Sequence, residues 1–353
     1  MDLKELRKKI DALDAQLVNL LNQRSEVSKH IGKFKLARKQ SIYAPDREQK
    51  VFDGLAMLNQ GPLPDEALVG IYREIMSSSL ALEKPLQIAM LGQEGSYTSA
   101  AAKKKFGSQI SYIPCMNIAE VFHKVEHGDC DYGVVAIENS TEGSVRNTYD
   151  LFVDSELKIC SQVMVKIAHH FMSKTSLRNI KRIYSHPQVF GQCRQWLWSH
   201  LPEAKQIWVQ STSEGAEIAA REKNAAAIAS KETARTTKLK ILHSNIQDIP
   251  HNTTKFFVIA PEDAAPSGND RTSILFSIKD RVGALYGMLT PFYKHKINLT
   301  KIESRPSKKR VWDYYFFVDF EGHRLDKNVQ KALSQLDEMC KYLKILGSYP
   351  VVK

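Results

Sequence analysis

The N-terminal stretch of this chain carries the pattern that most constrains its fold. This pattern predicts a single helix that, at about 1.5 Å per residue, would be roughly 50 Å long. Such a helix is too long for a compact monomer of three helices, so we expect an interleaved homodimer, or a higher homo-oligomer, to bury it. The apolar residues recur at alternating intervals of three and four, with no proline and one late glycine: Leu3, Leu6, Ile10, Leu13, Leu17, Leu20, Val27, Ile31 and Phe34.

Charged and polar residues interrupt this apolar seam. Two shorter helices are predicted to open near Pro45 and near Asp65, because proline and acidic residues suit a first helical turn. A charge in an apolar seam is costly unless something pairs with it. For any single residue a surface position is an equally good explanation, but not for the whole set. The three helices direct seven such side chains toward one interior: Arg7, Arg24, Lys35, Arg47, Glu48, Ser79 and Glu83.

Residues 1–84 resemble the all-helical chorismate mutases. The resemblance rests on LRKKIDALD, Arg24, GKFK, PDRE and SSSLALE. It implies a unimolecular rearrangement of chorismate to prephenate, which needs no nucleophile, metal or cofactor. Arginine suits the two substrate carboxylates, because its guanidinium binds them in a bidentate manner and never loses its charge.

The same resemblance implies a role for each of the seven residues. The carboxylate ligands would be Arg24, Arg47, Ser79 and, reaching in from the partner subunit, Arg7. The donors to the ether oxygen would be Lys35 and Glu83, and the acceptor for the ring hydroxyl would be Glu48. Glu83 can donate only when protonated, and the sequence leaves the direction of its pKa shift open. Many relatives carry an acid where this chain has Ala44.

Residues 85–261 alternate between strand and helix patterns. Regular alternation predicts a doubly wound, mostly parallel sheet. The strands suffice for two sheets, so we expect two lobes with a cleft between them, similar to bacterial solute-binding proteins. Helices are predicted at 98–106 and 118–126. Strands are predicted at 86–92, 110–115, 134–137, 159–167, 180–184, 207–209, 225–229 and 255–259.

The stretch YGVVAIENSTEGSV, from Tyr132 to Val145, joins a buried strand to a polar turn and a new helix. In open α/β sheets, ligands bind beyond the carboxyl ends of the strands, and the N–H groups of a helix start suit an anion. An ordinary capped loop would have the same pattern. The stretch therefore predicts an anion-binding site only in combination with other motifs.

Those motifs resemble prephenate dehydratases: IENSTEG, YSHPQ, QCRQWL and NIQDIPHNTTKF. The resemblance implies loss of a ring hydroxyl and carbon dioxide, which needs an acid for the hydroxyl and anchors for two carboxylates. It places Thr254 at the departing hydroxyl. The cleft residues would be Glu138, Asn139, Ser140, Thr141, Ser185, His186 and Gln188.

Some positions of this region have a second interpretation or depart from the family. Ser185 and His186 precede a proline and could simply start a helix, and His169 is expected to be structural. Lys255 replaces the arginine of the family's T-R-F motif, which keeps the charge but loses the bidentate fork. Ala136 replaces the proline before I-E-N.

After a linker at 262–270, residues 271–353 follow a β-α-β-β-α-β order, which is typical of ferredoxin-like α+β domains. G-A-L at 283–285 and E-S-R-P at 303–306 resemble the phenylalanine-binding motifs of ACT regulatory domains. Val282 replaces the usual proline before G-A-L. The effector residues implied by the resemblance are Gly283, Ala284, Leu285, Asn298, Leu299, Glu303, Ser304 and Arg305.

Composition excludes several other classes. The net charge of +11 is spread through all segments and interleaved with acids, so a nucleic-acid partner is not predicted. The N-terminus is charged and no apolar run could cross a membrane, so we expect a cytoplasmic protein with no membrane partner. Five scattered cysteines without a C-x-x-C pair indicate neither disulfides nor zinc.

The sequence thus predicts a multidomain, cofactor-free enzyme. It would convert chorismate to prephenate and then to phenylpyruvate, with feedback inhibition by L-phenylalanine. Two alternatives stay open: a non-catalytic amino-acid-sensing regulator, and a mutase whose dehydratase domain is inactive.

Overall fold

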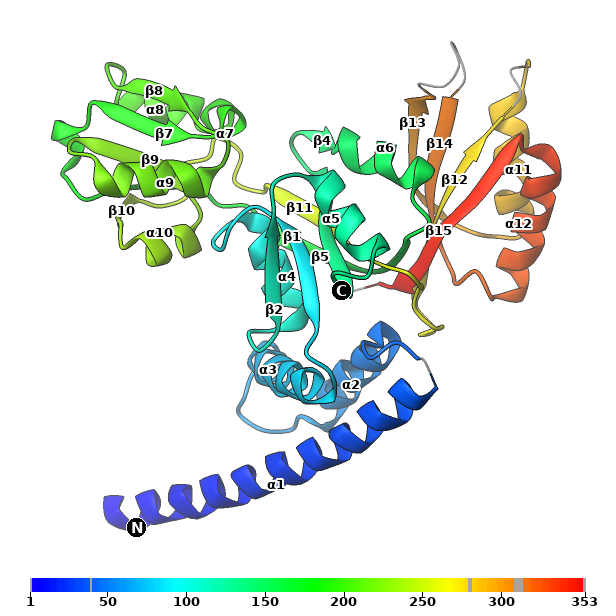
Figure 1. Cartoon of the computed structure of the whole chain (residues 1–353), viewed down its shortest axis with the longest axis horizontal. Helices are drawn as coiled ribbons and strands as arrows, with labels where there is room; N and C mark the ends of the chain where they lie inside the picture. The colour runs from blue at the N-terminus through cyan, green and yellow to red at the C-terminus, as the bar shows by residue number, and fades with distance from the viewer. Residues whose placement is uncertain (1, 39, 279–280, 308–313, 352–353) are drawn as a thin grey trace.

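The computed structural model describes residues 2–38, 40–278, 281–307 and 314–351. The chain forms a helical region, a two-lobed α/β region and an α+β region, in sequence order (Figure 1). This order agrees with the predicted multidomain fold. No helix in the described ranges is long and apolar enough to cross a membrane.

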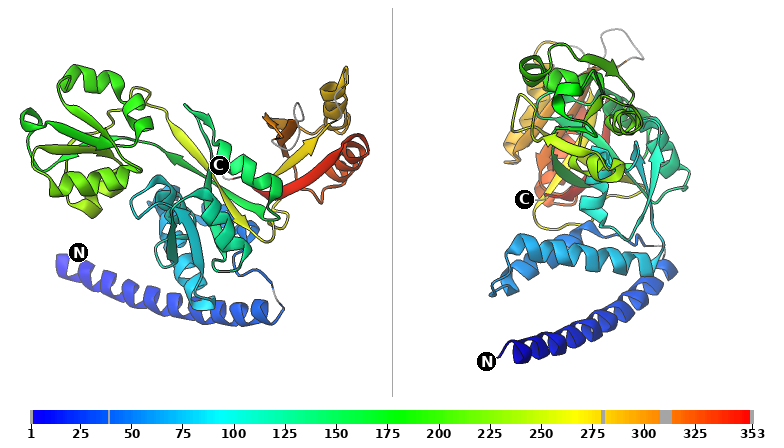
Figure 2. Two further views of the ribbon diagram at one scale, coloured as in Figure 1. Left: turned by 45° about the horizontal axis from the view of Figure 1, so that its top comes forward. Right: turned by 90° about the vertical axis from the view of Figure 1, so that its left-hand side faces the viewer.

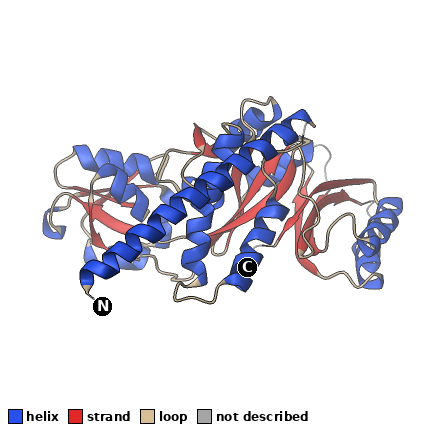
Figure 3. Ribbon diagram, turned by 90° about the horizontal axis from the view of Figure 1, so that it is seen from below, coloured by secondary structure: helices blue, strands red, loops and turns tan. Residues whose placement is uncertain are grey.

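The helical region consists of α1 (Leu3–Ala37), α2 (Pro45–Leu58) and α3 (Asp65–Glu83). Asp2 and Glu5 form a capping box at the start of α1. The prediction of one long N-terminal helix is confirmed, since α1 runs for 35 residues. It lies along one side of the molecule as a curved rod, and its N-terminal half extends away from α2 and α3 (Figures 2 and 3).

The apolar stripe of α1 is uncovered in the single chain. The nine apolar residues predicted to form the seam are each between 44% and 61% exposed. In contrast, Ile42 and Tyr43, in the connection between α1 and α2, are buried in the core of the α/β region beside Phe106 and Tyr132. The helical region is therefore anchored to its neighbour, while its longest helix presents an open apolar face.

The first lobe has a six-stranded sheet in the order β2-β1-β3-β11-β5, with β4 paired to β3. Its strands are β1 (Gln87–Leu91), β2 (Ser111–Cys115), β3 (Tyr132–Asn139), β4 (Gly143–Ser144), β5 (Lys158–Lys166) and β11 (Thr253–Ala260). Its helices are α4 (Tyr97–Phe106), α5 (Ile118–Glu126) and α6 (Arg146–Asp154).

The second lobe has a five-stranded sheet in the order β10-β6-β9-β7-β8. Its strands are β6 (His170–Ser173), β7 (Arg182–Ser185), β8 (Lys205–Trp208), β9 (Ala225–Ala229) and β10 (Lys240–His243). Its helical segments are η1 (Leu177–Asn179), α7 (Pro187–Gln192), α8 (Arg194–His200), α9 (Thr212–Arg221) and α10 (Lys231–Thr237).

The two lobes agree with the prediction, but the expectation of mostly parallel sheets was wrong. In the first lobe β1 is parallel to β2 and β3, whereas β11 is antiparallel to both β3 and β5. The second lobe is mixed in the same way. The reason is topological: the chain leaves the first lobe after β5 and returns as β11, so the returning strand runs against its neighbours.

The third region has the predicted β-α-β-β-α-β order. Its elements are β12 (Asp270–Ser277), α11 (Ala284–Lys294), β13 (Leu299–Pro306), β14 (Tyr314–Glu321), α12 (Lys327–Met339) and β15 (Tyr342–Pro350). The sheet order is β13-β14-β12-β15, with every pairing antiparallel. The sequence pattern predicts the strand β14 from residue 311, and residues 308–313 lie outside the described residues.

One face of this sheet packs against the first lobe. Phe317 and Tyr349 share a hydrophobic core with Phe152 and Phe257 of that lobe. Gly347 makes this close approach possible: its φ is +147°, and an added Cβ would lie 2.3 Å from the carbonyl oxygen of Ile159. The α+β region and the first lobe therefore share one hydrophobic core.

Candidate functional site

The first candidate site lies where the second half of α1 meets α3. Arg24 Nη1 donates a hydrogen bond of 2.6 Å to Ser79 Oγ, and Ser79 is only 5% exposed. The two helices approach closely here, since an added Cβ on Gly32 would lie 2.8 Å from the Cβ of Glu83. The predicted carboxylate ligands Arg24 and Ser79 are thus brought together.

Lys35 and Glu83 form the next pair along the same interface. Lys35 Nζ lies 3.6 Å from Glu83 Oε2, too far for a strong hydrogen bond, and it donates instead to the carbonyl of Ile42. The Glu83 side chain is 8% exposed, and its buried Oε2 accepts no hydrogen bond. Burial therefore raises the pKa of Glu83 above its usual range, although Lys35 and Arg24 oppose the shift.

Three other predicted mutase residues do not join this group in the single chain. Arg7 is exposed, 17 positions before Arg24 on α1, which corresponds to about 25 Å along a helix. Arg47 is exposed on α2. Glu48 contacts other residues: its Oε2 lies 2.5 Å from Lys105 Nζ and accepts a hydrogen bond from Tyr43 Oη at 3.0 Å.

The Lys105–Glu48 pair joins the helical region to α4 of the first lobe. Both side chains are nearly buried, at 11% and 12% exposure. The ion pair and the hydrogen bond from Tyr43 both use Oε2 of Glu48, so this carboxylate has a structural contact in addition to its predicted role at the ring hydroxyl.

The second candidate site lies at the ends of β3 and β11. Asn139 Nδ2 donates to Thr254 Oγ1 at 2.8 Å and to Asn252 Oδ1 at 2.7 Å. Asn139 Oδ1 accepts from the backbone and hydroxyl of Thr141 and from the backbone N–H of Glu142. The amide of Asn139 therefore uses both of its donors and fixes the loop around Thr254.

Ser140 reinforces this loop. Its hydroxyl accepts from the backbone N–H of Thr253 at 2.9 Å and donates to the carbonyl of His251. The structure therefore brings together four of the predicted dehydratase residues, Asn139, Ser140, Thr141 and Thr254, in one polar cluster.

The residues predicted from the second lobe are placed differently. Ser185 is fully buried, and its hydroxyl donates to the carbonyl of Ile228. His186 is the N-cap of α7, and its Nδ1 accepts from the backbone N–H of Gln188 at 3.3 Å. Burial lowers the pKa of His186, so the ring is neutral near pH 7. The helix-start interpretation therefore describes His186, whereas Ser185 ends β7 and bonds to the neighbouring strand β9. Gln188 is exposed.

Residues that were not predicted as site residues link the two lobes. Gln192 donates to Glu142 Oε1 at 2.9 Å, and its Oε1 lies 2.6 Å from His169 Nε2. Tyr97 Oη lies 3.3 Å from His169 Nδ1. Burial lowers the pKa of His169, so this ring is also neutral. The QCRQWL and NTTKF motifs contain Gln192 and Asn252, but only the fold places these two amides beside the cluster.

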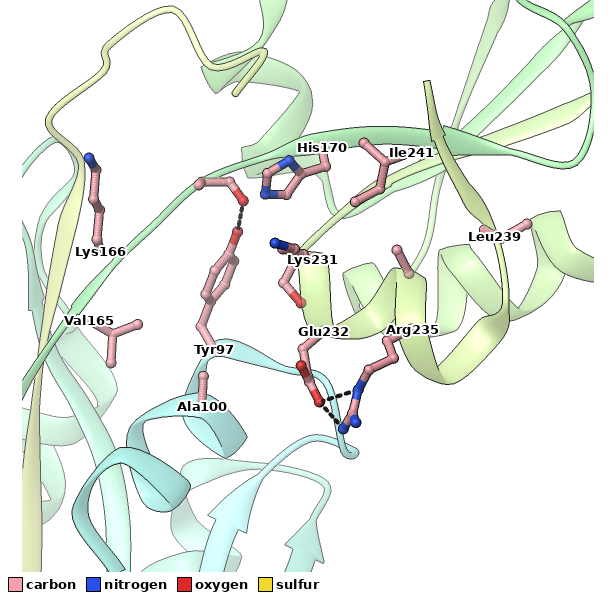
Figure 4. Close-up of a pocket in the computed structure, with 13 residues that line it drawn as sticks. Tyr97, Ala100, Val165, Lys166, His170, Lys231, Glu232, Arg235, Leu239 and Ile241 are labelled. Atoms are coloured by element: carbon pink, nitrogen blue, oxygen red, sulfur yellow. Dashed lines mark hydrogen bonds and ion pairs between the residues drawn. The ribbon is translucent and has the colours of Figure 1, made fainter. Parts of the chain in front are cut away.

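A cavity of about 620 Å³ opens between the lobes on the α4 and α10 side (Figure 4). Tyr97 and Lys166 line it from the first lobe, and His170 and Lys231 from the second. Its other lining residues are mainly apolar. The cavity therefore combines amines with an apolar wall, a combination that suits an organic anion.

Glu138 does not join the cluster around Thr254. Its Oε2 lies 2.8 Å from Lys301 Nζ of β13 and 3.8 Å from Lys255 Nζ. Burial lowers the pKa of Lys255, and the neighbouring Asp319 and Glu138 oppose this shift. Glu138 and Lys255 thus face the α+β region, whereas their sequence neighbours Asn139 and Thr254 belong to the polar cluster.

The predicted effector residues occupy two places in the α+β region. Gly283 has a φ of +74° and is the N-cap of α11, so glycine suits this position. Ala284 is buried and Leu285 is partly exposed. Asn298 precedes β13, which contains Leu299, Glu303, Ser304 and Arg305. In the part of the chain that the structure describes, no hydrogen bond or ion pair joins the two motifs.

No group of three His, Cys, Asp or Glu residues in the described ranges is arranged to hold a metal ion. All five cysteines are free thiols.

Three family descriptions match the chain in order. They are chorismate mutase type II at residues 6–84, prephenate dehydratase at 88–264 and ACT domain at 272–338. A bifunctional chorismate mutase/prephenate dehydratase of Aquifex aeolicus is 48% identical, covering 99% of this chain and 98% of the relative.

Two solved structures cover 75% of this chain. One is a prephenate dehydratase from Arthrobacter aurescens in complex with L-Phe, with a TM-score of 0.70, 32% identity and 90% of its own chain covered. The other is GqqA, described as a novel type of quorum quenching acylase, with a TM-score of 0.68, 27% identity and 98% of its own chain covered.

Proposed function

This chain belongs to the family of bifunctional chorismate mutase/prephenate dehydratases, and we propose how its residues carry the two reactions and their control. The enzyme converts chorismate to prephenate and prephenate to phenylpyruvate. The observation that carries the proposal is that one chain holds two separate polar clusters, one between α1 and α3 and one at the ends of β3 and β11.

In the mutase site, Arg24 and Ser79 bind a carboxylate of chorismate. Lys35 and protonated Glu83 donate to the ether oxygen, where negative charge develops as the carbon–oxygen bond breaks. Each preorganised donor of this kind typically lowers the barrier by about 3 kcal/mol. The raised pKa of Glu83 supports its role as a donor, since only the protonated carboxyl carries a hydrogen to share.

A second copy of the chain completes this site. The nine exposed apolar residues of α1 form a stripe that an identical helix would cover. In such a homodimer, Arg7 of the partner subunit would extend toward the carboxylate that Arg24 leaves unbound. The exposed Arg47 of α2 supplies the third guanidinium.

In the dehydratase site, Thr254 acts on the departing hydroxyl of prephenate. Because Thr254 Oγ1 accepts from Asn139, its own hydrogen is free to point at the leaving oxygen. The carbon–carbon bond to the ring carboxylate breaks and this group leaves as carbon dioxide, while the bonding electrons complete the aromatic ring. The hydroxyl gains a proton and leaves as water. We assign the carboxylate contacts to Lys166 and Lys231 of the neighbouring cavity.

L-phenylalanine is the proposed inhibitor, and the α+β region its binding site. The Arthrobacter prephenate dehydratase, whose structure contains L-Phe, resembles the α/β and α+β regions together. The G-A-L turn at the start of α11 and the E-S-R-P segment of β13 are the proposed effector contacts. The enzyme is proposed to act in the cytoplasm, where its five thiols stay reduced.

One coupled assay tests the whole proposal. Chorismate incubated with the purified chain should yield phenylpyruvate without any added metal or cofactor. Accumulation of prephenate alone would mean an inactive dehydratase, and no turnover would favour a non-catalytic amino-acid sensor. The assay is needed because the GqqA likeness indicates that this fold also occurs with a different described activity.

A further inference from the structure

The strand with the E-S-R-P motif lies directly against the dehydratase loop. Successive side chains of a strand point to opposite faces, so Lys301 and Arg305 share one face of β13. Figure 1 shows β13 beside α6. Lys301 Nζ lies 2.8 Å from Glu138 Oε2, and Arg305 Nη2 lies 3.2 Å from Asp150 Oδ1. Both contacts cross from the α+β region to the first lobe.

These two ion pairs lie on either side of the polar loop that begins at Asn139. Glu138 immediately precedes Asn139, whose amide holds Thr254. Asp150 lies on α6, which follows the loop and the short strand β4. β13 therefore contacts the chain on both sides of the segment that carries Asn139, and a displacement of β13 would reach both ends of that segment.

The lysines at Glu138 are largely buried, whereas Glu138 itself is 35% exposed. Lys301 and Lys255 are 14% and 15% exposed, and Lys255 Nζ also lies 3.9 Å from Asp319 Oδ2. Two lysines thus face two acids, and removing Lys301 would leave Glu138 with the longer, 3.8 Å contact to Lys255. Lys301 also lies over the ring of Tyr149, with Nζ 5.4 Å from the ring centre.

We propose that Lys301 is a positioning residue that couples the α+β region to the dehydratase site. Lys301 holds Glu138, Glu138 fixes the start of the loop, and Asn139 in that loop orients Thr254. A shift of β13 on effector binding would then reach Thr254 through the Lys301–Glu138 pair. The inference rests on the proposed dehydratase activity and its inhibition by L-phenylalanine. Lys301 itself touches no substrate.

The test compares Lys301→Met and Lys301→Arg with a matched control, Lys331→Met, which removes the same charge from the exposed face of α12. Phenylpyruvate formation from prephenate is measured with and without saturating L-phenylalanine, and L-phenylalanine binding is measured by calorimetry. In Lys301→Met the maximal inhibition should weaken at least fivefold, the lower end of usual allosteric couplings, while the dissociation constant changes less than about twofold. Lys301→Arg should keep the inhibition, and Lys331→Met should behave as wild type.

Undiminished inhibition in Lys301→Met would overturn the inference, as would a parallel loss of L-phenylalanine binding. Mutase activity in the same preparation shows whether the variant is folded. If it is not, Glu138→Ala removes the same ion pair from its other side, and full inhibition in that variant would also overturn the inference. If wild type turns over prephenate but is not inhibited by L-phenylalanine, the proposed regulation fails.

The role of Lys301 is then tested by the rate of phenylpyruvate formation without L-phenylalanine. Lys301→Met should lower this rate and Lys301→Arg should keep it at the wild-type value. An unchanged rate in Lys301→Met would overturn the inference.

Discussion

The helical region and the two-lobed region act on similar dicarboxylates by different means. In the helical region the proposed ligands include two cationic side chains, Arg24 and Lys35, on a helix that is still half uncovered in the single chain. In the two-lobed region the proposed centre is a network of neutral groups, with Asn139 and Thr254, that one chain closes by itself, and its proposed lysines line the neighbouring cavity. The first site has its cations inside the cluster and is incomplete in the single chain, whereas the second has a neutral, connected cluster with the cations beside it.

The chemistry explains this difference. A pericyclic rearrangement needs fixed charges around a folded substrate, and a guanidinium can reach its carboxylate from another subunit without losing its charge. An elimination needs one hydroxyl aimed at one leaving group. The orientation of that hydroxyl depends on hydrogen bonds of defined direction, which a network within one chain supplies.

Arg24→Ala should give the largest separation of the two activities. Removing a preorganised donor typically costs a hundredfold to a thousandfold, so mutase turnover should fall by about that factor. Dehydration of supplied prephenate should be nearly unchanged, because Arg24 lies outside the second cluster. Steady-state rates on chorismate and prephenate measure both effects. Arg38→Ala is the control: it removes an exposed arginine of the same chain that stacks on Phe34. A parallel fall of both activities in folded Arg24→Ala would refute the two-site comparison.

Glu83→Gln should change the pH dependence of the mutase alone. Burial raises the pKa of Glu83. The protonated donor is present below this pKa and is lost as the pH rises through it, so wild-type mutase activity should decline toward alkaline pH. Glutamine keeps an N–H donor at every pH and should flatten this decline. Rates across pH 5 to 9, which is about the range a raised carboxyl pKa would cover, provide the measurement.

Two outcomes would contradict this role for Glu83. The alkaline decline could persist in Glu83→Gln, or Glu83→Ala could lose less than about tenfold, below the usual cost of a lost donor. Either result would leave Lys35 as the only donor to the ether oxygen. Dehydratase rates over the same pH range serve as the internal control.

Lys105→Met should have the smallest effect on turnover and a clear effect on stability. Lys105 holds Glu48 at the buried junction of the helical region and the first lobe. Breaking a buried pair costs about 3 kcal/mol, whereas an exposed pair contributes at most about 1 kcal/mol. The thermal unfolding midpoint of Lys105→Met should therefore fall well below that of Lys103→Met. Lys103 lies on the same helix and pairs with Glu94, and this pair is more exposed than the Lys105–Glu48 pair. Mutase turnover at 25 °C should stay within about threefold, the equivalent of less than 1 kcal/mol. A tenfold change in mutase rate would instead indicate that Glu48 takes part in the mutase reaction.

The sequence by itself determined the order of the three regions and most of their elements. Periodicity predicted the long helix, because the 3.6-residue repeat of α1 is a local property of its residues. The motifs predicted that Arg24 and Ser79 belong to one site and that Asn139 and Thr254 belong to another, because the residue types in those motifs suit the chemistry of each site. The sequence also indicated the β-α-β-β-α-β order of the third region.

Only the tertiary structure decided which neighbours each charge has. Adjacent residues in a strand point to opposite faces, so Glu138 and Asn139 were one motif in the sequence but belong to different environments in the fold. Glu48 was assigned to a substrate, yet it is held by Lys105, 57 residues away. The antiparallel return of β11 was likewise hidden, because strand direction depends on how the chain crosses between lobes. Local patterns determine helices and strands, whereas ion pairs and strand direction depend on contacts between residues far apart in the chain.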